Sequence, residues 1–133
     1  PKDSIVIEVS EDKVKGGLSD VLDKIVELKN NGFHIAIDNY GAKYADLFLF
    51  SEVKFDTLKL DRELVHKLET DEKTCMISKS VIDICKNYNI SVVAEGVENE
   101  KEYDILKEMG CDEAQGYLFD KPMSWNRFEE KYL

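Results

Sequence analysis

The chain has 133 residues, enough for one domain whose core buries roughly two-thirds of the unfolded surface. Its 43% apolar content is typical of a globular protein and argues against disorder. The formal net charge of −10 argues against a nucleic-acid partner, because phosphate backbones bind basic surfaces. The apolar runs are too short to cross a bilayer, so we expect no membrane contact from this segment.

Strand and helix patterns alternate along the chain. Five short apolar runs predict strands over residues 4–9, 33–37, 55–60, 90–94 and 114–119. Amphipathic or capped segments predict helices over residues 18–29, 62–68, 72–88 and 99–109, with one short helical stretch at 47–50. A last helix is expected after Ser124, with Trp125, Phe128 and Tyr132 facing inward.

Strand–helix repetition at this spacing is the βαβ pattern, which predicts a parallel sheet in an α/β fold. The units fit either an open doubly wound sheet or part of a (β/α)₈ barrel. Five strands cannot close an eight-stranded barrel, so the barrel interpretation is an incomplete TIM-type barrel of about five β/α units. No glycine-rich phosphate loop follows any predicted strand, and nucleotide binding through such a turn is unsupported.

Each of five short apolar runs leads into one polar residue whose side chain could take part in chemistry. These residues are Glu8, Asp38, Lys59, Glu95 and Gln115. If the strands are parallel, their carboxyl ends lie at one edge of the sheet, and the five side chains converge there. Three carboxylates, an amide and an ammonium group indicate divalent-metal binding and phosphate-ester chemistry. Taken singly, each residue is as well explained as an ordinary surface or capping group.

The three cysteines, Cys75, Cys85 and Cys111, form no Cys-x-x-Cys pair. Cys75 and Cys85 share a predicted helix, where ten residues separate them by about 15 Å, too far for a disulfide. An odd and unpaired set fits a reducing compartment, so we expect a cytoplasmic protein.

Four segments carry a resemblance to a known family. They read IAIDNYGAKY at 35–44, TLKLDR at 57–62, VVAEGVE at 92–98 and GCDEAQGYLFDKP at 110–122, preceded by IEVSE at 7–11. In this order and spacing they resemble the C-terminal part of the EAL domain of bacterial signalling proteins. The resemblance covers essentially all 133 residues, which would make residues 1–133 the C-terminal portion of such a domain without its N-terminal barrel units.

The resemblance implies a (β/α)₈ barrel that hydrolyses cyclic di-GMP to the linear dinucleotide with the help of two Mg²⁺ or Mn²⁺ ions. It implies metal binding by Glu8 and Asp38, and catalytic roles for Lys59 and Glu95. Supporting roles fall to Glu98, Gln115 and Glu11, of which the last steadies the loop after the metal-binding pair.

The sequence departs from the family pattern in two ways. The expected Glu-Ala-Leu stretch and a metal-binding asparagine belong to the barrel's first part, which this chain lacks. The family's Asp-Asp-Phe-Gly reads Asp38-Asn39-Tyr40-Gly41, so a neutral amide replaces the carboxylate that bridges both metals. Two cations close together need negative charge between them, and we expect a weakened, degenerate metal site at Asn39. The following loop also departs, with Lys43 and Asp46 in place of glycine and serine.

Three hypotheses remain open. The first is a degenerate EAL domain that binds cyclic di-GMP or protein partners without hydrolysing the dinucleotide. The second is a fragment of an active metal-dependent phosphodiesterase. The third is a purely structural or dimerising module. In each, we expect a homodimer or another domain to cover the open barrel edge, which would otherwise expose apolar surface.

Overall fold

A parallel sheet forms the centre of the molecule, for which a computed structural model describes residues 1, 4–15, 19–43 and 46–133. Its strands are β1 (Val6–Ser10), β2 (His34–Tyr40), β3 (Thr57–Leu60), β4 (Ser91–Glu95) and β5 (Glu113–Gln115). Neighbouring strands run parallel in every pair. The prediction of five parallel strands in an α/β fold is therefore confirmed.

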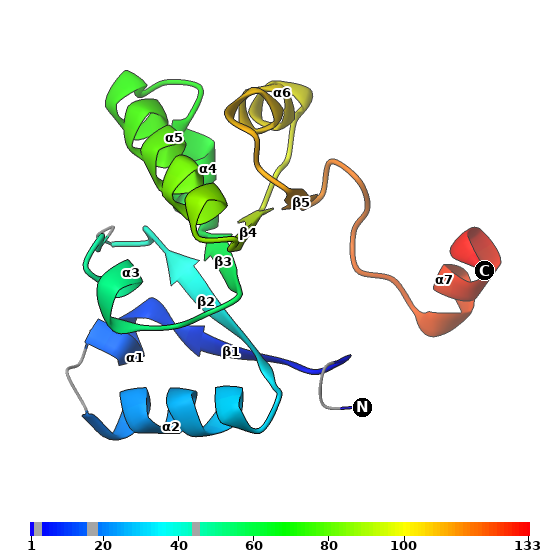
Figure 1. The fold of residues 1–133 in the computed structure, drawn as a ribbon. Helices are drawn as coiled ribbons and strands as arrows, with labels where there is room; N and C mark the ends of the chain where they lie inside the picture. Colours follow the sequence, from blue (N-terminus) through cyan, green and yellow to red (C-terminus); the bar gives the residue numbers. More distant parts are fainter. Residues whose placement is uncertain (2–3, 16–18, 44–45) are drawn as a thin grey trace.

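The helices lie mainly around one side of this sheet (Figure 1). They are α1 (Glu11–Lys15), α2 (Ser19–Asn30), α3 (Leu49–Glu52), α4 (Arg62–Lys67), α5 (Glu72–Asn87), α6 (Glu100–Met109) and α7 (Trp125–Tyr132). The helix predicted over residues 18–29 corresponds to α2, and its predicted first residue, Leu18, lies outside the described residues. Within the described ranges, every helix is too short or too polar to span a bilayer.

The order of the strands across the sheet follows their order in the chain, from β1 to β5. A doubly wound sheet reverses its strand order at a switch point, whereas a barrel adds each strand beside the previous one. The sequential order therefore favours the barrel over the open doubly wound alternative. Because every pair is parallel, the carboxyl ends of all five strands lie at one edge of the sheet.

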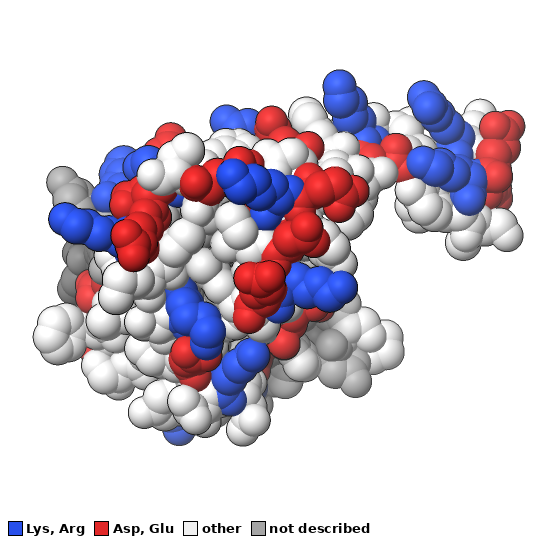
Figure 2. Space-filling view, turned by 90° about the horizontal axis from the view of Figure 1, so that it is seen from above, with Lys and Arg blue, Asp and Glu red and all other residues white. Residues whose placement is uncertain are grey.

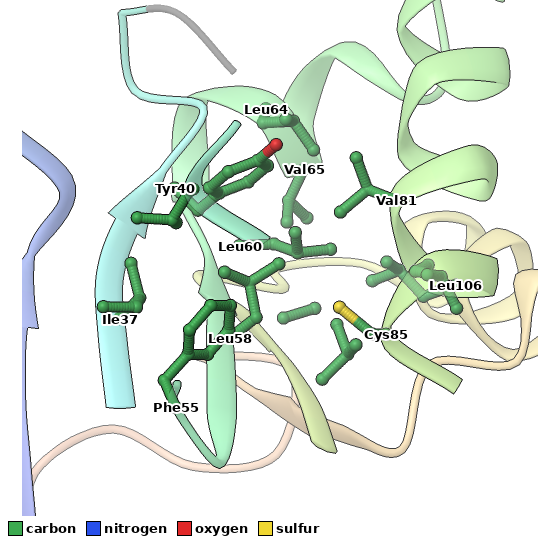
Figure 3. Packing of buried hydrophobic residues seen from close by; sticks show 14 of the residues in the cluster. Ile37, Tyr40, Phe55, Leu58, Leu60, Leu64, Val65, Val81, Cys85 and Leu106 are labelled. Carbon is green, nitrogen blue, oxygen red and sulfur yellow. The ribbon is translucent and has the colours of Figure 1, made fainter. Parts of the chain in front are cut away.

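Side chains alternate between the two faces of the sheet, as strand geometry requires. Leu58 and Leu60 of β3 are fully buried, together with Val92 and Ala94 of β4. Figure 3 shows this packing, with α5 residues such as Cys85 in the same cluster. We call this surface the helix face. The opposite surface, which carries Glu8, Asp38, Lys59 and Glu95, is the open face.

The last strand is shorter than predicted, because the chain turns after Gln115. Leu118 N donates to the carbonyl of Val97 at 3.0 Å, which folds residues 116–119 back over the loop after β4. A Cβ at Gly116 would lie 2.1 Å from Val97 O, so only glycine permits this approach. The aromatic residues of the predicted strand, Tyr117 and Phe119, consequently lie exposed beyond β5.

The expected inward packing of the last helix is wrong. Trp125 and Tyr132 are 65% and 51% exposed, and α7 has no buried residue. Figure 1 shows α7 standing away from the sheet at the end of an extended segment. The aromatic rings contact one another instead: Trp125 and Phe128 are stacked with centroids 6.0 Å apart, and Phe128 and Tyr132 are tilted with centroids 5.1 Å apart. The spacing of the aromatic residues correctly indicates a helix, but burial also requires a surface for these side chains to pack against, which the spacing does not specify.

Candidate functional site

Lys59 lies at the centre of a charged cluster on the open face. Its Nζ is 2.6 Å from Glu8 Oε1, 2.8 Å from Glu95 Oε1 and 3.7 Å from Asp38 Oδ1. These contacts join residues from β1, β2, β3 and β4. The structure thus brings together four of the side chains that the strand-end pattern singles out.

The strands place these groups by register and alternation. Lys59 lies between the buried Leu58 and Leu60, so its side chain points to the opposite face. The pairing of β2 with β3 shifts between Ile37 and Tyr40, which is a bulge-like irregularity at the level of Asp38. Such irregularities re-aim side chains next to functional sites.

The Lys59 ammonium group is strongly held in its charged form. Burial alone would lower the pKa of Lys59, but the hydrogen bonds that its Nζ donates to Glu8 and Glu95 outweigh burial and raise the pKa well above its ordinary value. Three carboxylates face one ammonium, so the cluster keeps an excess of negative charge. An additional cation is therefore favoured at this edge on electrostatic grounds.

Asn39 has a backbone that few side chains adopt. Its φ is 58°, in the left-handed region where asparagine and aspartate are enriched. Its Nδ2 donates to Asp38 Oδ2 at 3.2 Å, and the side chain is otherwise exposed. The position is thus turned toward solvent beside Asp38, with an amide in contact with one of the two carboxylate oxygens.

The donors on the open face match a hard divalent cation in chemical type. Asp38 Oδ1 is buried without a hydrogen-bond partner, which leaves one oxygen available for a further ligand. Carboxylate oxygens are the ligands that Mg²⁺ and Mn²⁺ prefer. Among the described residues, however, no group of three or more Asp, Glu, His or Cys side chains is arranged to hold an ion. The carboxylates surround Lys59 Nζ instead.

Glu11 holds the loop that follows the Asp38–Asn39 pair. Its carboxylate is buried and accepts from Gly41 N at 3.1 Å and from Asp46 N at 3.2 Å. The two oxygens thus span both ends of the loop, whose Tyr44 and Ala45 lie outside the described residues. Lys43 forms a loose, exposed ion pair with Asp12 at 3.6 Å.

Glu98 and Gln115 lie near the cluster but outside its ion pairs. Gln115 is paired with Glu95 across β4 and β5, and its side chain is exposed. Glu98 lies in the loop after β4, with Oε1 3.8 Å from His66 Nε2. Within the described part of the chain, the ion-pair partners of Lys59 do not include Glu98.

Sequence reasoning missed a second polar group beside this site. His66 Nδ1 lies 2.6 Å from Glu102 Oε1. At the start of the same helix, α6, Asn99 Oδ1 accepts from Glu102 N at 2.9 Å, which caps the helix. The partner of the Glu102 carboxylate is 36 residues away in the chain, beyond any local pattern.

Charged side chains elsewhere are mixed in sign. Figure 2 shows acidic and basic residues interspersed over one face of the molecule, rather than a broad basic surface.

The model of the EAL domain matches residues 1–122 of this chain. A cyclic di-GMP phosphodiesterase of Pseudomonas aeruginosa, RocR, is 36% identical over 128 residues, which are 96% of this chain and 33% of RocR. The probable cyclic di-GMP phosphodiesterase PdeG of Escherichia coli is 31% identical over 122 residues, covering 92% of this chain and 24% of PdeG. This chain therefore spans about a third or less of these relatives' length.

Solved structures agree with the sequence matches. The EAL enzyme Bd1971, in a form with cAMP and cyclic di-GMP bound, superposes with a TM-score of 0.87 at 30% identity. That alignment covers 97% of this chain and 34% of Bd1971. Klebsiella pneumoniae BlrP1, in a complex with calcium and cyclic di-GMP, gives a TM-score of 0.87 at 35% identity, over 91% of this chain and 31% of BlrP1.

Proposed function

This chain belongs to the EAL domain family, and on that premise we propose that its open face binds cyclic di-GMP with little or no hydrolysis. One observation carries the proposal. Lys59, Glu8 and Glu95 are assembled as a charged cluster, while the amide of Asn39 contacts Asp38 where the family pattern has a second carboxylate. A site of this kind keeps groups for recognising a phosphate diester but has a weakened means of holding two cations.

Each residue of the site has a distinct proposed role. The Lys59 ammonium neutralises the negative charge of the phosphate diester. Glu95 is the candidate base or metal ligand, and Glu8 and Asp38 are candidate ligands of Mg²⁺ or Mn²⁺. When bound, such an ion would supply a nucleophilic hydroxide and neutralise charge on the phosphate. The homologue BlrP1 has been solved with manganese and cyclic di-GMP, which supports metal dependence in the family.

Ligand entry would require the cluster to rearrange. A metal ion at Glu8 and Asp38 competes with Lys59 for the same oxygens, and the phosphate competes with the carboxylates for Lys59. Asn39 weakens the metal's side of this competition, because an amide carries no charge and its N–H group already contacts Asp38. The residues therefore fit ligand binding better than sustained two-metal catalysis.

Supporting residues complete the proposal. Glu11 fixes the loop after Asn39 through its bonds to Gly41 and Asp46. We propose that the exposed side chains of Gln115, at the end of β5, and of Glu98, in the loop after β4, contact the ligand's bases or sugars. We further propose that residues 1–133 form the C-terminal part of an EAL barrel, whose outer strands are covered by another domain or a second copy.

The three cysteines support a cytoplasmic location for the protein. Cys75, Cys85 and Cys111 are all free thiols. Unpaired thiols persist in a reducing compartment and are uncommon in oxidising ones.

The proposal is tested by calorimetry and by a hydrolysis assay on the full-length protein. Cyclic di-GMP should bind in the presence of Mn²⁺, the Lys59→Met variant should lose at least about tenfold in affinity, and turnover should stay near the uncatalysed background. No heat at high micromolar ligand would leave only the structural role.

The hydrolase alternative makes the opposite prediction. It is favoured by the presence of both Lys59 and Glu95 in one cluster. Turnover that disappears in Glu95→Gln would establish it and overturn the degenerate interpretation. Asn39→Asp should strengthen Mn²⁺ binding under either hypothesis, and an unchanged affinity would place Asn39 outside the metal site.

A further inference from the structure

A buried carboxylate beside the proposed site has no role in the chemistry described above. Glu102 of α6 is only 3% exposed, yet it carries a charge, and buried carboxylates are rare unless each oxygen is satisfied. Oε2 accepts from the backbone N–H of Glu98 at 2.8 Å, and Oε1 lies 2.6 Å from His66 Nδ1. Both oxygens are therefore used.

These two bonds join the loop after β4 to helix α4. Residues 96–99 form this loop, which connects Glu95 of the Lys59 cluster to the start of α6. His66 belongs to α4, which begins three residues after Lys59. A single carboxylate thus connects the loop behind Glu95 to the helix behind Lys59.

A second contact joins the same helix to the same loop. Arg62 lies four residues before His66 on α4, so the two side chains share one face of the helix. The Arg62 stem lies across Gly96, where an added Cβ would come within 2.3 Å of Arg62 Cγ. Gly96 also has a φ of 71°, which other residues rarely adopt. The face of α4 formed by Arg62 and His66 thus contacts the loop at Gly96 and at Glu98.

The charge state of Glu102 fits this arrangement. Burial alone would raise its pKa, but the bonds from the Glu98 amide and from His66 outweigh burial and lower the pKa. The carboxylate is therefore ionised at neutral pH. Charge-assisted hydrogen bonds to a backbone amide are stronger than neutral ones, and they hold a loop more firmly.

We propose that Glu102 is a positioning residue, which fixes the loop carrying Glu98 and following Glu95, and that His66 holds Glu102 in place from α4. The inference rests on the proposed function, because that function assigns ligand-related roles to Glu95, which precedes the loop, and to Glu98, which lies in it. Glu102 itself touches no ligand under this proposal. It acts by limiting the loop to one conformation, so that ligand binding does not have to order the loop.

The backbone amides of the loop provide a test that needs no ligand. Glu98 N donates to Glu102, whereas the neighbouring Val97 N donates to Gln115 O at 3.0 Å. In Glu102→Leu, hydrogen exchange at the Glu98 amide should accelerate by at least about tenfold. Exchange at the Val97 amide should stay near its wild-type rate, because its acceptor is unchanged. NMR spectroscopy resolves the two amides in one experiment.

Three further variants complete the experiment. His66→Leu should accelerate exchange at Glu98 severalfold, and it decides the question if Glu102→Leu does not fold. Glu102→Gln should accelerate exchange less than either leucine variant, because its carbonyl can still accept from Glu98 and its amide can donate to a neutral His66 ring, and only the contribution of the charge is lost. Lys101→Ala changes the residue next to Glu102 on α6 and removes only its ion pair with Glu69, which lies between α4 and α5, so it should change neither amide.

Affinity for cyclic di-GMP should follow the exchange rates, with a loss of about tenfold in Glu102→Leu and less than about threefold in Glu102→Gln. Wild-type exchange at Glu98 in both leucine variants would overturn the proposal, as would equal acceleration at Glu98 and Val97, which indicates general destabilisation. If wild-type protein binds no cyclic di-GMP, the proposed function fails, while the exchange rates still decide whether Glu102 positions the loop.

Discussion

The helix face and the open face of the sheet come from the same strands but are held together by different forces. On the helix face, Leu58 and Leu60 are fully buried in an apolar cluster. On the open face, Lys59 is 13% exposed and lies among three carboxylates. Hydrophobic packing stabilises the helix face, and the attraction between Lys59 and the carboxylates stabilises the open face. Alternation along one strand therefore separates the residues that keep the domain folded from the charged residues that we propose bind a ligand.

The largest expected effect is on the helix face. Leu58→Ala should lower the free energy of unfolding by about 2–5 kcal/mol, because it leaves a cavity among rigid neighbours. Urea denaturation at neutral pH measures the change. Thr57→Ala, on the adjoining half-exposed position, is the matched control and should cost less than about 1 kcal/mol. Similar losses in the two variants would contradict the distinction between the faces.

The next largest effect is expected at alkaline pH, which should lower the free energy of unfolding through two thiols in or against the helix-face cluster. Burial raises the pKa of the Cys85 thiol to about 12 and that of Cys111 to about 11, against an ordinary value of 9.0. The folded protein thus keeps protons that the unfolded chain releases, so stability is full below about pH 9 and falls as pH rises toward 11. Each thiol contributes a loss of up to about 1.4 kcal/mol per pH unit.

Urea denaturation between pH 7 and 10.5 measures this slope. Cys85→Ala removes one of the two thiols and should flatten the decline by about one proton's contribution. An identical slope in Cys85→Ala would show that the thiol does not control alkaline stability. The raised pKa of Lys59 acts in the same direction, since the stabilisation from its charge is lost as pH rises above the ordinary lysine range.

The open face should respond to salt instead. Lys59→Met leaves Glu8, Asp38 and Glu95 without their shared cation, and we expect a loss of about 1–2 kcal/mol at low ionic strength. High salt screens the repulsion among the carboxylates and should recover part of this loss. Leu58→Ala should show no such recovery. A Lys59→Met penalty that is independent of salt would mean that packing, not charge, dominates the open face.

The smallest effect is expected in α7, which packs on neither face. Trp125→Ser should change the free energy of unfolding by less than about 0.5 kcal/mol, because the ring is mostly exposed and touches mainly Phe128. Thermal or urea unfolding measures the difference. A loss above about 1 kcal/mol would show that α7 contacts the domain, or a second copy, in solution.

Much of the sheet could be predicted from the sequence. Alternating strand and helix patterns indicate parallel strands. The carboxyl ends of parallel strands share one edge of the sheet, which predicts that Glu8, Asp38, Lys59 and Glu95 lie together. Such arguments work because strand direction and pleat are set by local chain geometry. The family resemblance added the roles of these residues, which remain predictions.

Other features could not be predicted, because they depend on contacts between distant segments. The bond between His66 and Glu102 joins two helices, and no local pattern announces it. The short β5 follows from the close approach of Gly116 to Val97, where the apolar run alone indicated a longer strand. In α7, the aromatic spacing is sound for a helix, but burial also requires a partner surface.

The left-handed backbone at Asn39 has an evolutionary consequence. Asparagine and aspartate are both enriched at a φ near 58°, so the chain follows the same path with either residue. A lineage can therefore gain or lose a carboxylate at this position without rebuilding the fold around it.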